Sequence, residues 1–173
     1  MKQVDEIIYD AIKADETLKT LLGWKPATST TPEVKPRVIS TCFEVPPEEE
    51  DNTPLPNIII IDDGLVNQQT TKDCVWEAAE DRVQVSVDIA ANSPKDVKTL
   101  VKMVRRAVES YIGTLYTQGE DIPELESLTA DQLKWDWMVP CYHQTLTYQC
   151  ITISDTDDDE QEEQPGTGGD ENS

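Results

Sequence analysis

The chain is poor in positive charge. It has 14 lysines and arginines against 35 aspartates and glutamates, so its formal net charge at pH 7 is −21. A protein that grips nucleic-acid phosphates needs clustered Lys and Arg, and this balance argues against that class. Long apolar runs are also missing, because no stretch approaches the roughly 18 to 20 residues of a transmembrane helix. Asp5 and Glu6 interrupt the stretch where a signal peptide has its apolar run, so we expect a soluble intracellular chain with no membrane contact.

Catalytic motifs are scarce as well. The sequence has seven glycines, of which three fall after residue 164, and it contains neither a Gly-rich phosphate loop nor a Gly-x-Ser-x-Gly nucleophile motif. Four cysteines are too few and too scattered for a disulfide scaffold. We therefore expect no enzyme activity, no catalytic residue and no cofactor.

Two weak metal patterns remain. Cys141 and His143, the single histidine, would share one face of a strand, and with Cys74 and Cys150 they could form a four-ligand zinc site. No pair has the Cys-x-x-Cys spacing, however, and Cys150 has the opposite strand parity to Cys141, so buried thiols and an incidental histidine are favoured. Asp62-Asp63-Gly64 follows an apolar strand, where a metal-dependent hydrolase could place its acids, but the same residues are typical of a turn, which we favour. No metal is expected.

The end of the sequence differs from the rest. Residues 155–173 contain nine acids, no base and no apolar residue, which predicts a self-repelling disordered tail. Residues 1–154 keep 26 acids and 14 bases and carry the apolar residues, which predicts one domain with its own core.

Two segments have the periodicity of amphipathic helices. The first apolar stripe is Val4, Ile7, Ile8, Ala11 and Ile12, with Asp5, Glu6, Asp10 and Lys13 expected on other faces. A short turn follows, with Asp15 as its N-cap and Gly23 as its stop. The main helix is expected from Pro94 to Leu115, where Ser93 can cap the first turn. Its basic residues are expected to form a solvated face: Lys98, Lys102, Arg105 and Arg106.

Strands are predicted between and after these helices. Residues 37–45 are rich in β-branched residues, and residues 57–62 hold four consecutive isoleucines, which suits a strand covered on both faces. Residues 82–90 alternate cleanly between apolar and polar. Residues 134–137 and 142–153 follow, with a short turn expected at 127–131. The remaining segments, 25–36 and 63–80, are expected as a loop and as a long hairpin or flap.

These elements define the fold class. The order of helix, strands, helix and strands predicts an α+β, or mixed α/β, fold. A mostly antiparallel sheet of four to five strands would pack on two main helices. The aromatic residues near residue 135 could bind a ligand or stack on bases, but one Trp closing a corner of the core, with the other on the surface, is favoured: Trp135, Trp137, Tyr142 and Tyr148.

The order and spacing of these segments resemble a family of phage proteins. Residues 7–23, with their Lys-Ala-Asp helix and Leu-Leu-Gly stop, are similar to the opening of phage tail-completion and tail-terminator proteins, which include minor tail and head–tail joining proteins. Leu55-Pro56-Asn57-Ile58 resembles the family's next strand. The alternating segment at 83–89, the helix at 94–115 and the closing strand at 142–153 also fit, so the similarity spans about residues 4–153.

The resemblance implies a structural virion protein in the tail or neck, made in the host cytoplasm. Such proteins form a ring, usually a hexamer, at the head-proximal end of the tail, where the ring ends tube polymerisation and joins the capsid connector. The implied partners are copies of the chain itself, the tail tube protein and the head–tail connector or stopper protein. DNA would pass through the lumen without specific binding, which a negative surface favours.

One segment is our candidate for the oligomer or partner interface. Four apolar residues stand among polar ones in 63–80: Leu65, Val66, Val75 and Trp76. They could equally pack beneath their own loop. Two other functions stay open, namely an acidic adaptor or inhibitor that binds basic partners, and a small metal-dependent hydrolase.

Overall fold

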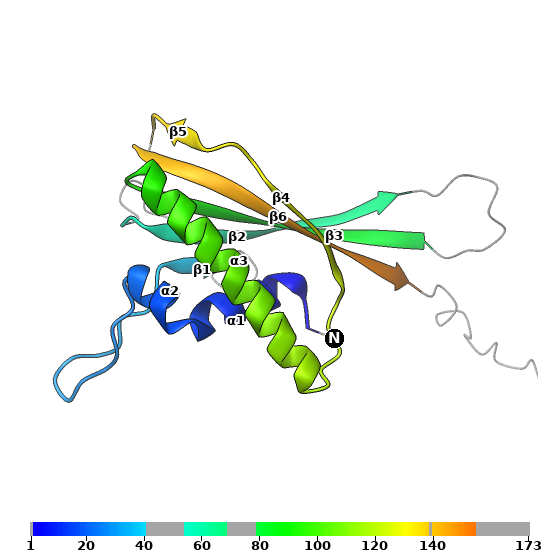
Figure 1. The fold of residues 1–173 in the computed structure, drawn as a ribbon, viewed down its shortest axis with the longest axis horizontal. Helices are drawn as coiled ribbons and strands as arrows, with labels where there is room; N and C mark the ends of the chain where they lie inside the picture. The colour runs from blue at the N-terminus through cyan, green and yellow to red at the C-terminus, as the bar shows by residue number, and fades with distance from the viewer. Residues whose placement is uncertain (1, 41–53, 69–78, 139, 155–173) are drawn as a thin grey trace, which may run out of the picture.

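The structure is a computed structural model, which describes residues 2–40, 54–68, 79–138 and 140–154. One sheet and one layer of helices make up this part of the chain (Figure 1). The elements along the chain are α1 (Val4–Ala14), α2 (Glu16–Leu21), β1 (Val38–Ser40), β2 (Asn57–Gln68), β3 (Ala79–Ala91), α3 (Pro94–Thr117), β4 (Leu125–Ala130), β5 (Lys134–Asp136) and β6 (Cys141–Ser154). The predicted α+β class with a mostly antiparallel sheet is therefore confirmed.

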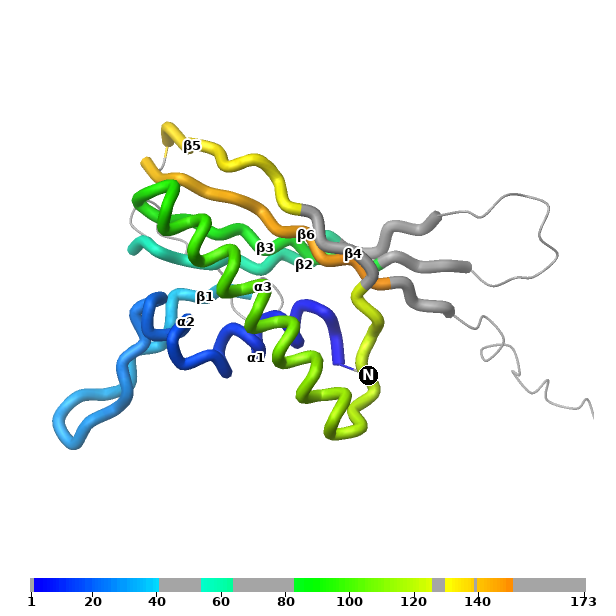
Figure 2. Tube along the Cα trace, viewed as in Figure 1, coloured from blue at the N-terminus to red at the C-terminus, as the bar shows by residue number. Residues whose placement is uncertain are grey.

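The sheet is organised around three long strands. Its order is β1-β2-β3-β6-β4, and β5 pairs with β6 beyond the end of β4. Among the described strands, only β1 and β2 run parallel, and every other pair is antiparallel. The long strands continue past the helices at one end (Figure 1), and the tube trace shows β2, β3 and β6 running side by side behind α3 (Figure 2). At the other end lie β5, the start of α3 and a projecting segment between α2 and β1.

The helices begin and end where local side-chain chemistry directs them. Asp15 Oδ1 accepts a hydrogen bond from Leu18 N at 2.8 Å at the start of α2. Ser93 Oγ accepts one from Asp96 N at 3.1 Å at the start of α3, and Pro94 occupies the first turn. Gly23, with a φ of 89°, ends the α2 segment in a conformation that only glycine adopts without strain. The predicted caps and stop are confirmed.

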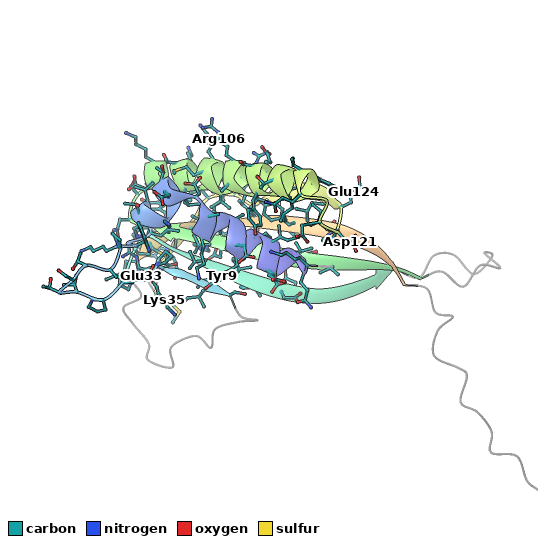
Figure 3. The ribbon with its side chains drawn as sticks, turned by 90° about the horizontal axis from the view of Figure 1, so that it is seen from below. Tyr9, Glu33, Lys35, Arg106, Asp121 and Glu124 are labelled. Atoms are coloured by element: carbon teal, nitrogen blue, oxygen red, sulfur yellow. The ribbon has the colours of Figure 1, made fainter. Side chains whose placement is uncertain are left out.

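The core lies between the helices and one face of the sheet. The predicted stripe of α1 is buried, and so are most apolar residues of α3, with Ile112 half-buried: Val97, Leu100, Val101, Val104, Val108 and Leu115. The sheet contributes alternate residues, including Ile58, Ile60, Val85, Val87, Ile89 and Leu146, all fully buried. Seen from below, α1 and α3 lie side by side and cover this face of the sheet (Figure 3). The alternation of apolar residues in β3 and β6 thus places the core on one side of the sheet.

Several expectations about the sheet were wrong. The predicted turn at 127–131 is mostly strand β4, whose alternation is broken by a register shift between Leu125 and Ser127. Asp62-Asp63-Gly64 is not a turn either, because β2 continues through it with a bulge between Asp62 and Gly64. The four isoleucines are covered on one face only, since Ile61 is 38% exposed.

Two further expectations need correction or lie outside the described residues. Asp5 was placed on a polar face of α1, yet it is 2% exposed, so the helix buries it beside the apolar stripe. Of the strand predicted at 37–45, the structure describes β1, and residues 41–45 lie outside its described part. The acidic segment 155–173 lies outside it too. No helix in the described part of the chain has the length and hydropathy to cross a membrane.

Candidate interaction surfaces

The predicted interface is only partly described. Leu65 and Val66 belong to the far half of β2, where their backbones pair with Val83 and Arg82 of β3. Val75 and Trp76 lie outside the described residues. The pairing of β2 with β3 shows that the segment 63–80 includes parts of the two strands of a long hairpin. A long hairpin was one of the two structures predicted for this segment, and a flap was the other. The interface role of these four residues stays a prediction.

A second apolar surface was missed from the sequence. Trp137 and Met138, in the turn between β5 and β6, are 85% and 93% exposed. Asp136 Oδ1 accepts a hydrogen bond from Met138 N at 2.8 Å, which fixes the backbone of the turn. Single exposed apolar residues are common, but two large neighbours exposed on one turn are a candidate contact surface. We call Trp137 and Met138 the apolar tip.

The rings behind the tip support it. Trp135 contacts Tyr142 edge to face, with ring centroids 4.6 Å apart, and contacts Trp137 at 6.0 Å with the rings nearly perpendicular. Trp135 is itself 37% exposed, so neither tryptophan closes a corner of the core. Tyr148 does not belong to this aromatic group, because it is buried in the core. Only the expected surface position of one Trp is confirmed. Along its outer edge, β5 has no further strand among the described residues.

Residues 24–36 form a projecting arm (Figure 1). Lys25 and Val34 exchange two backbone hydrogen bonds of 3.0 Å, so this predicted loop is a narrow hairpin. At its base, Trp24 Nε1 donates to Glu33 Oε1 at 2.7 Å, and Lys19 Nζ lies 3.9 Å from the centroid of the Trp24 ring. The arm is therefore held in shape by its own contacts while its outer residues stay exposed.

The arm is fastened to the sheet through Arg37. Its Nε donates to Pro56 O at 2.7 Å, and its backbone N donates to Leu22 O at 2.9 Å. A Cβ at Gly23 would collide with the Arg37 guanidinium. Glycine at this position thus serves both the turn and the close approach of the arginine.

A recess of about 300 Å³ lies at this end of the molecule. The end of α2 and the start of α3 form two of its walls, and the ends of the sheet strands form the rest. Its lining is mainly apolar and includes Leu21, Pro56, Ala91 and Leu100, with Asp96 at the rim. Leu21 is 47% exposed, so the recess opens to solvent next to the base of the arm.

The face of the sheet away from the helices carries the polar candidates. His143 Nδ1 lies 3.2 Å from Asp88 Oδ1, and Thr145 Oγ1 donates to the same oxygen at 3.1 Å. Cys141 is buried, and burial, aided by the carboxylates of Asp136 and Asp88, raises the pKa of its thiol. The cysteine is thus a neutral thiol near pH 7, whereas a metal ligand or nucleophile needs the thiolate.

The Asp62–Asp63 pair lies within β2 on the same sheet. Asp63 Oδ2 accepts hydrogen bonds from Ser86 Oγ and, at 3.4 Å, from Gln84 Nε2. Its carboxylate therefore bonds to side chains of the neighbouring strand. Among the described residues, no three His, Cys, Asp or Glu side chains gather in a way that could hold a metal ion. Cys74 lies outside that part of the chain.

Known proteins offer little for comparison. No family model matches the sequence, and no curated protein is significantly similar to it. Among solved structures, a chain of a particle titled "Virion of native gene transfer agent (GTA) particle" is similar, with a TM-score of 0.41 and 12% sequence identity. The match covers 87% of this chain and 95% of the other. At this TM-score the likeness is too distant to carry a conclusion about function.

Proposed function

We propose that the chain is a structural, non-enzymatic component of a phage-like virion that works by binding copies of itself and neighbouring shell proteins. More specifically, it would form a ring at the head-proximal end of a tail tube, end tube growth and join the tail to the capsid connector. The resemblance of residues 4–153 to tail-completion and tail-terminator proteins supports this proposal. DNA would pass through such a ring without specific binding.

The observation that carries the proposal is the apolar tip. A closed ring needs two different surfaces on each copy, because the contact is head to tail. Trp137 and Met138 offer one surface, preformed by the Trp135 and Tyr142 rings. The recess beside Leu21 and the arm offer others of different shape. Tryptophan and methionine are enriched in protein interfaces, and tryptophan is among the residues whose removal costs most binding energy.

The test is the assembly state of the full chain. Native mass spectrometry and sedimentation velocity should show a ring-sized oligomer, either alone or with the tail tube protein. Trp137→Ser with Met138→Ser should weaken assembly about 30-fold or more, as expected when a central interface residue is lost. Tyr116→Ser is the matched control, because Tyr116 is also an exposed aromatic, at 59%, but lies near the end of α3.

Three outcomes would contradict the proposal. A chain that stays monomeric at high concentration, with and without the tube protein, cannot be a ring component. Salt-sensitive binding to basic proteins by a monomer would favour the acidic adaptor. Metal-dependent turnover that is lost in Asp62→Asn or Asp63→Asn would favour the hydrolase.

A further inference from the structure

The outer face of α3 gathers positive charge in this acidic chain. Five of the 14 basic residues lie on it within twelve positions, and all five are exposed: Lys95, Lys98, Lys102, Arg105 and Arg106. Figure 3 shows Arg106 directed away from the body, on the side of α3 opposite the sheet. We call these five residues the basic face.

The basic face repels itself. Lys98–Lys102 and Lys102–Arg106 are four residues apart, and Lys95–Lys98 and Lys102–Arg105 are three apart, so neighbours on the helix surface carry like charge. Lys95 also lies in the first turn, where the helix dipole disfavours a cation, while the last turn of α3 has no base. These like charges and the helix dipole therefore lower the stability of α3 as an isolated helix.

One acid, the exposed Glu109, lies on the same side of α3 four residues after Arg105, and the five bases outnumber it. None of the five bases forms an ion pair with a described residue, although Lys2, Lys19 and Lys134 do. On the same helix, Asp96 accepts a hydrogen bond from Ser93 Oγ at 2.7 Å within the cap. A face with five bases, one acid and no ion pair to a described residue keeps a positive charge, which suits an anionic partner.

The sequence contains an anionic segment of matching size. Residues 155–163 hold seven acids and no base, which suits pairing with a stripe of five bases. The segment begins directly after Ser154, the last residue of β6. The start of α3 lies at the opposite end of that strand, because Tyr142 pairs with Ala91, three residues before Pro94.

Chain length limits pairing within one copy. The 13 steps from Cys141 to Ser154 span about 44 Å at about 3.4 Å per residue. Nine residues reach at most about 32 Å when fully extended. Residues 155–163 of a copy therefore fall short of its own Lys95 and Lys98, at the start of the basic face, so only the segment of an adjacent copy can cover the whole face.

We propose that the basic face of α3 binds the acidic segment 155–163 of a neighbouring copy of this chain. The inference rests on the proposed self-assembly and names one of its contacts. Duplex DNA fits less well, because a long polyanion would also meet the remaining surface of a body whose net charge over residues 1–154 is −12.

The test mixes two isotopically labelled pools of the full-length protein. A carbodiimide joins a lysine amine to a carboxylate only where the two groups touch. Mass spectrometry should find Lys98 or Lys102 joined to residues 155–163, with one peptide from each pool. Lys25 and Lys35, exposed on the arm, are internal controls and should give few such links.

A variant separates charge pairing from chance proximity. Arg105→Glu with Arg106→Glu keeps the reactive lysines but reverses two neighbouring charges, and should lower the yield of mixed links about tenfold. Lys25→Glu with Lys35→Glu makes the same charge change on the arm and should leave the yield unchanged. Raising the salt from about 0.1 M to about 1 M should lower the yield too, because it shortens the screening length.

The outcomes separate this inference from the proposed function. Oligomers without mixed links at α3, or links within one copy only, would overturn the inference and leave the ring intact. A monomer under all conditions would overturn both. A third outcome would reassign the basic face to DNA. In it, the wild-type protein retains duplex DNA, the Arg105→Glu, Arg106→Glu variant does not, and mixed links are either absent or unchanged in the variant.

Discussion

The two faces of the sheet use the same strands for different purposes. Towards the helices, β2, β3 and β6 present Ile60, Val87 and Leu146, which are fully buried. Away from the helices, the same strands present Asp63, Asp88 and Thr145, joined across strands by side-chain hydrogen bonds. The first face gains its stability from removing apolar area from water, and the second from hydrogen bonds that water can replace in part. The fold should therefore depend far more on the first.

The most direct way to break this comparison uses two neighbouring isoleucines. Ile60→Ala should lower the free energy of unfolding by about 2 to 5 kcal/mol, because it leaves a cavity in the core beneath α1. Ile61→Ala, on the open face, should cost less than about 1 kcal/mol. Urea denaturation of both variants gives the two values. Equal losses would mean that something covers the open face as fully as the helices cover the other.

Tyr148 sharpens the comparison, because it is a polar group on the helix-covered face. Its hydroxyl is buried with no hydrogen-bond partner among the described residues, and burial raises the pKa of Tyr148 to about 12. Above pH 10 the unfolded chain loses the phenolic proton while the folded chain keeps it. Stability should therefore fall as the pH rises from about 10 to 12, by up to about 2.7 kcal/mol from this residue alone.

Tyr148→Phe should remove that alkaline loss. Near pH 7 the variant should be as stable as the wild type or slightly more so, because it lacks an unpaired buried hydroxyl. Denaturation curves at pH 7, 10 and 11 check both statements. Parallel loss of stability in the two proteins above pH 10 would contradict the assignment of the effect to Tyr148.

Asp88 tests the open face itself. Asp88→Ala removes the acceptor shared by His143 and Thr145 and should cost about 1 kcal/mol, since all three groups keep some contact with water. Asp88→Asn keeps an acceptor oxygen and should cost less than half as much. A loss from Asp88→Ala as large as that from Ile60→Ala would show that the polar face also determines the fold.

The sequence predicted the helix-covered face better than the surfaces. Periods of three to four and of two are set by burial, so they identified the stripes of α1 and α3 and the strand β3. Asp62-Asp63-Gly64 was mistaken for a turn because a bulged strand and a turn favour the same residues. β4 was missed because its alternation is interrupted at the register shift.

The candidate surfaces were harder to predict, because exposure is a property of the assembled fold. The basic face of α3 was visible from the helical period, but its lack of described partners was not. Trp137 looked like one member of an aromatic cluster, and nothing local distinguishes a tryptophan in the core from one on a turn. The Asp136 and Pro140 that flank Trp137 and Met138 are a signal that could have indicated the turn.

The smallest expected effect concerns that turn. Trp137→Ser should change the free energy of unfolding of the monomer by less than about 0.5 kcal/mol, because a side chain 85% exposed loses little packing. Urea denaturation at low protein concentration gives this value, and the assembly assay on the same variant should still show a large loss. A residue that affects assembly but not folding belongs to an interface, whereas one that affects both would be supporting β5 through Trp135. Trp135→Ser is the matched comparison, and it should cost more stability because the Trp135 ring packs on Tyr142.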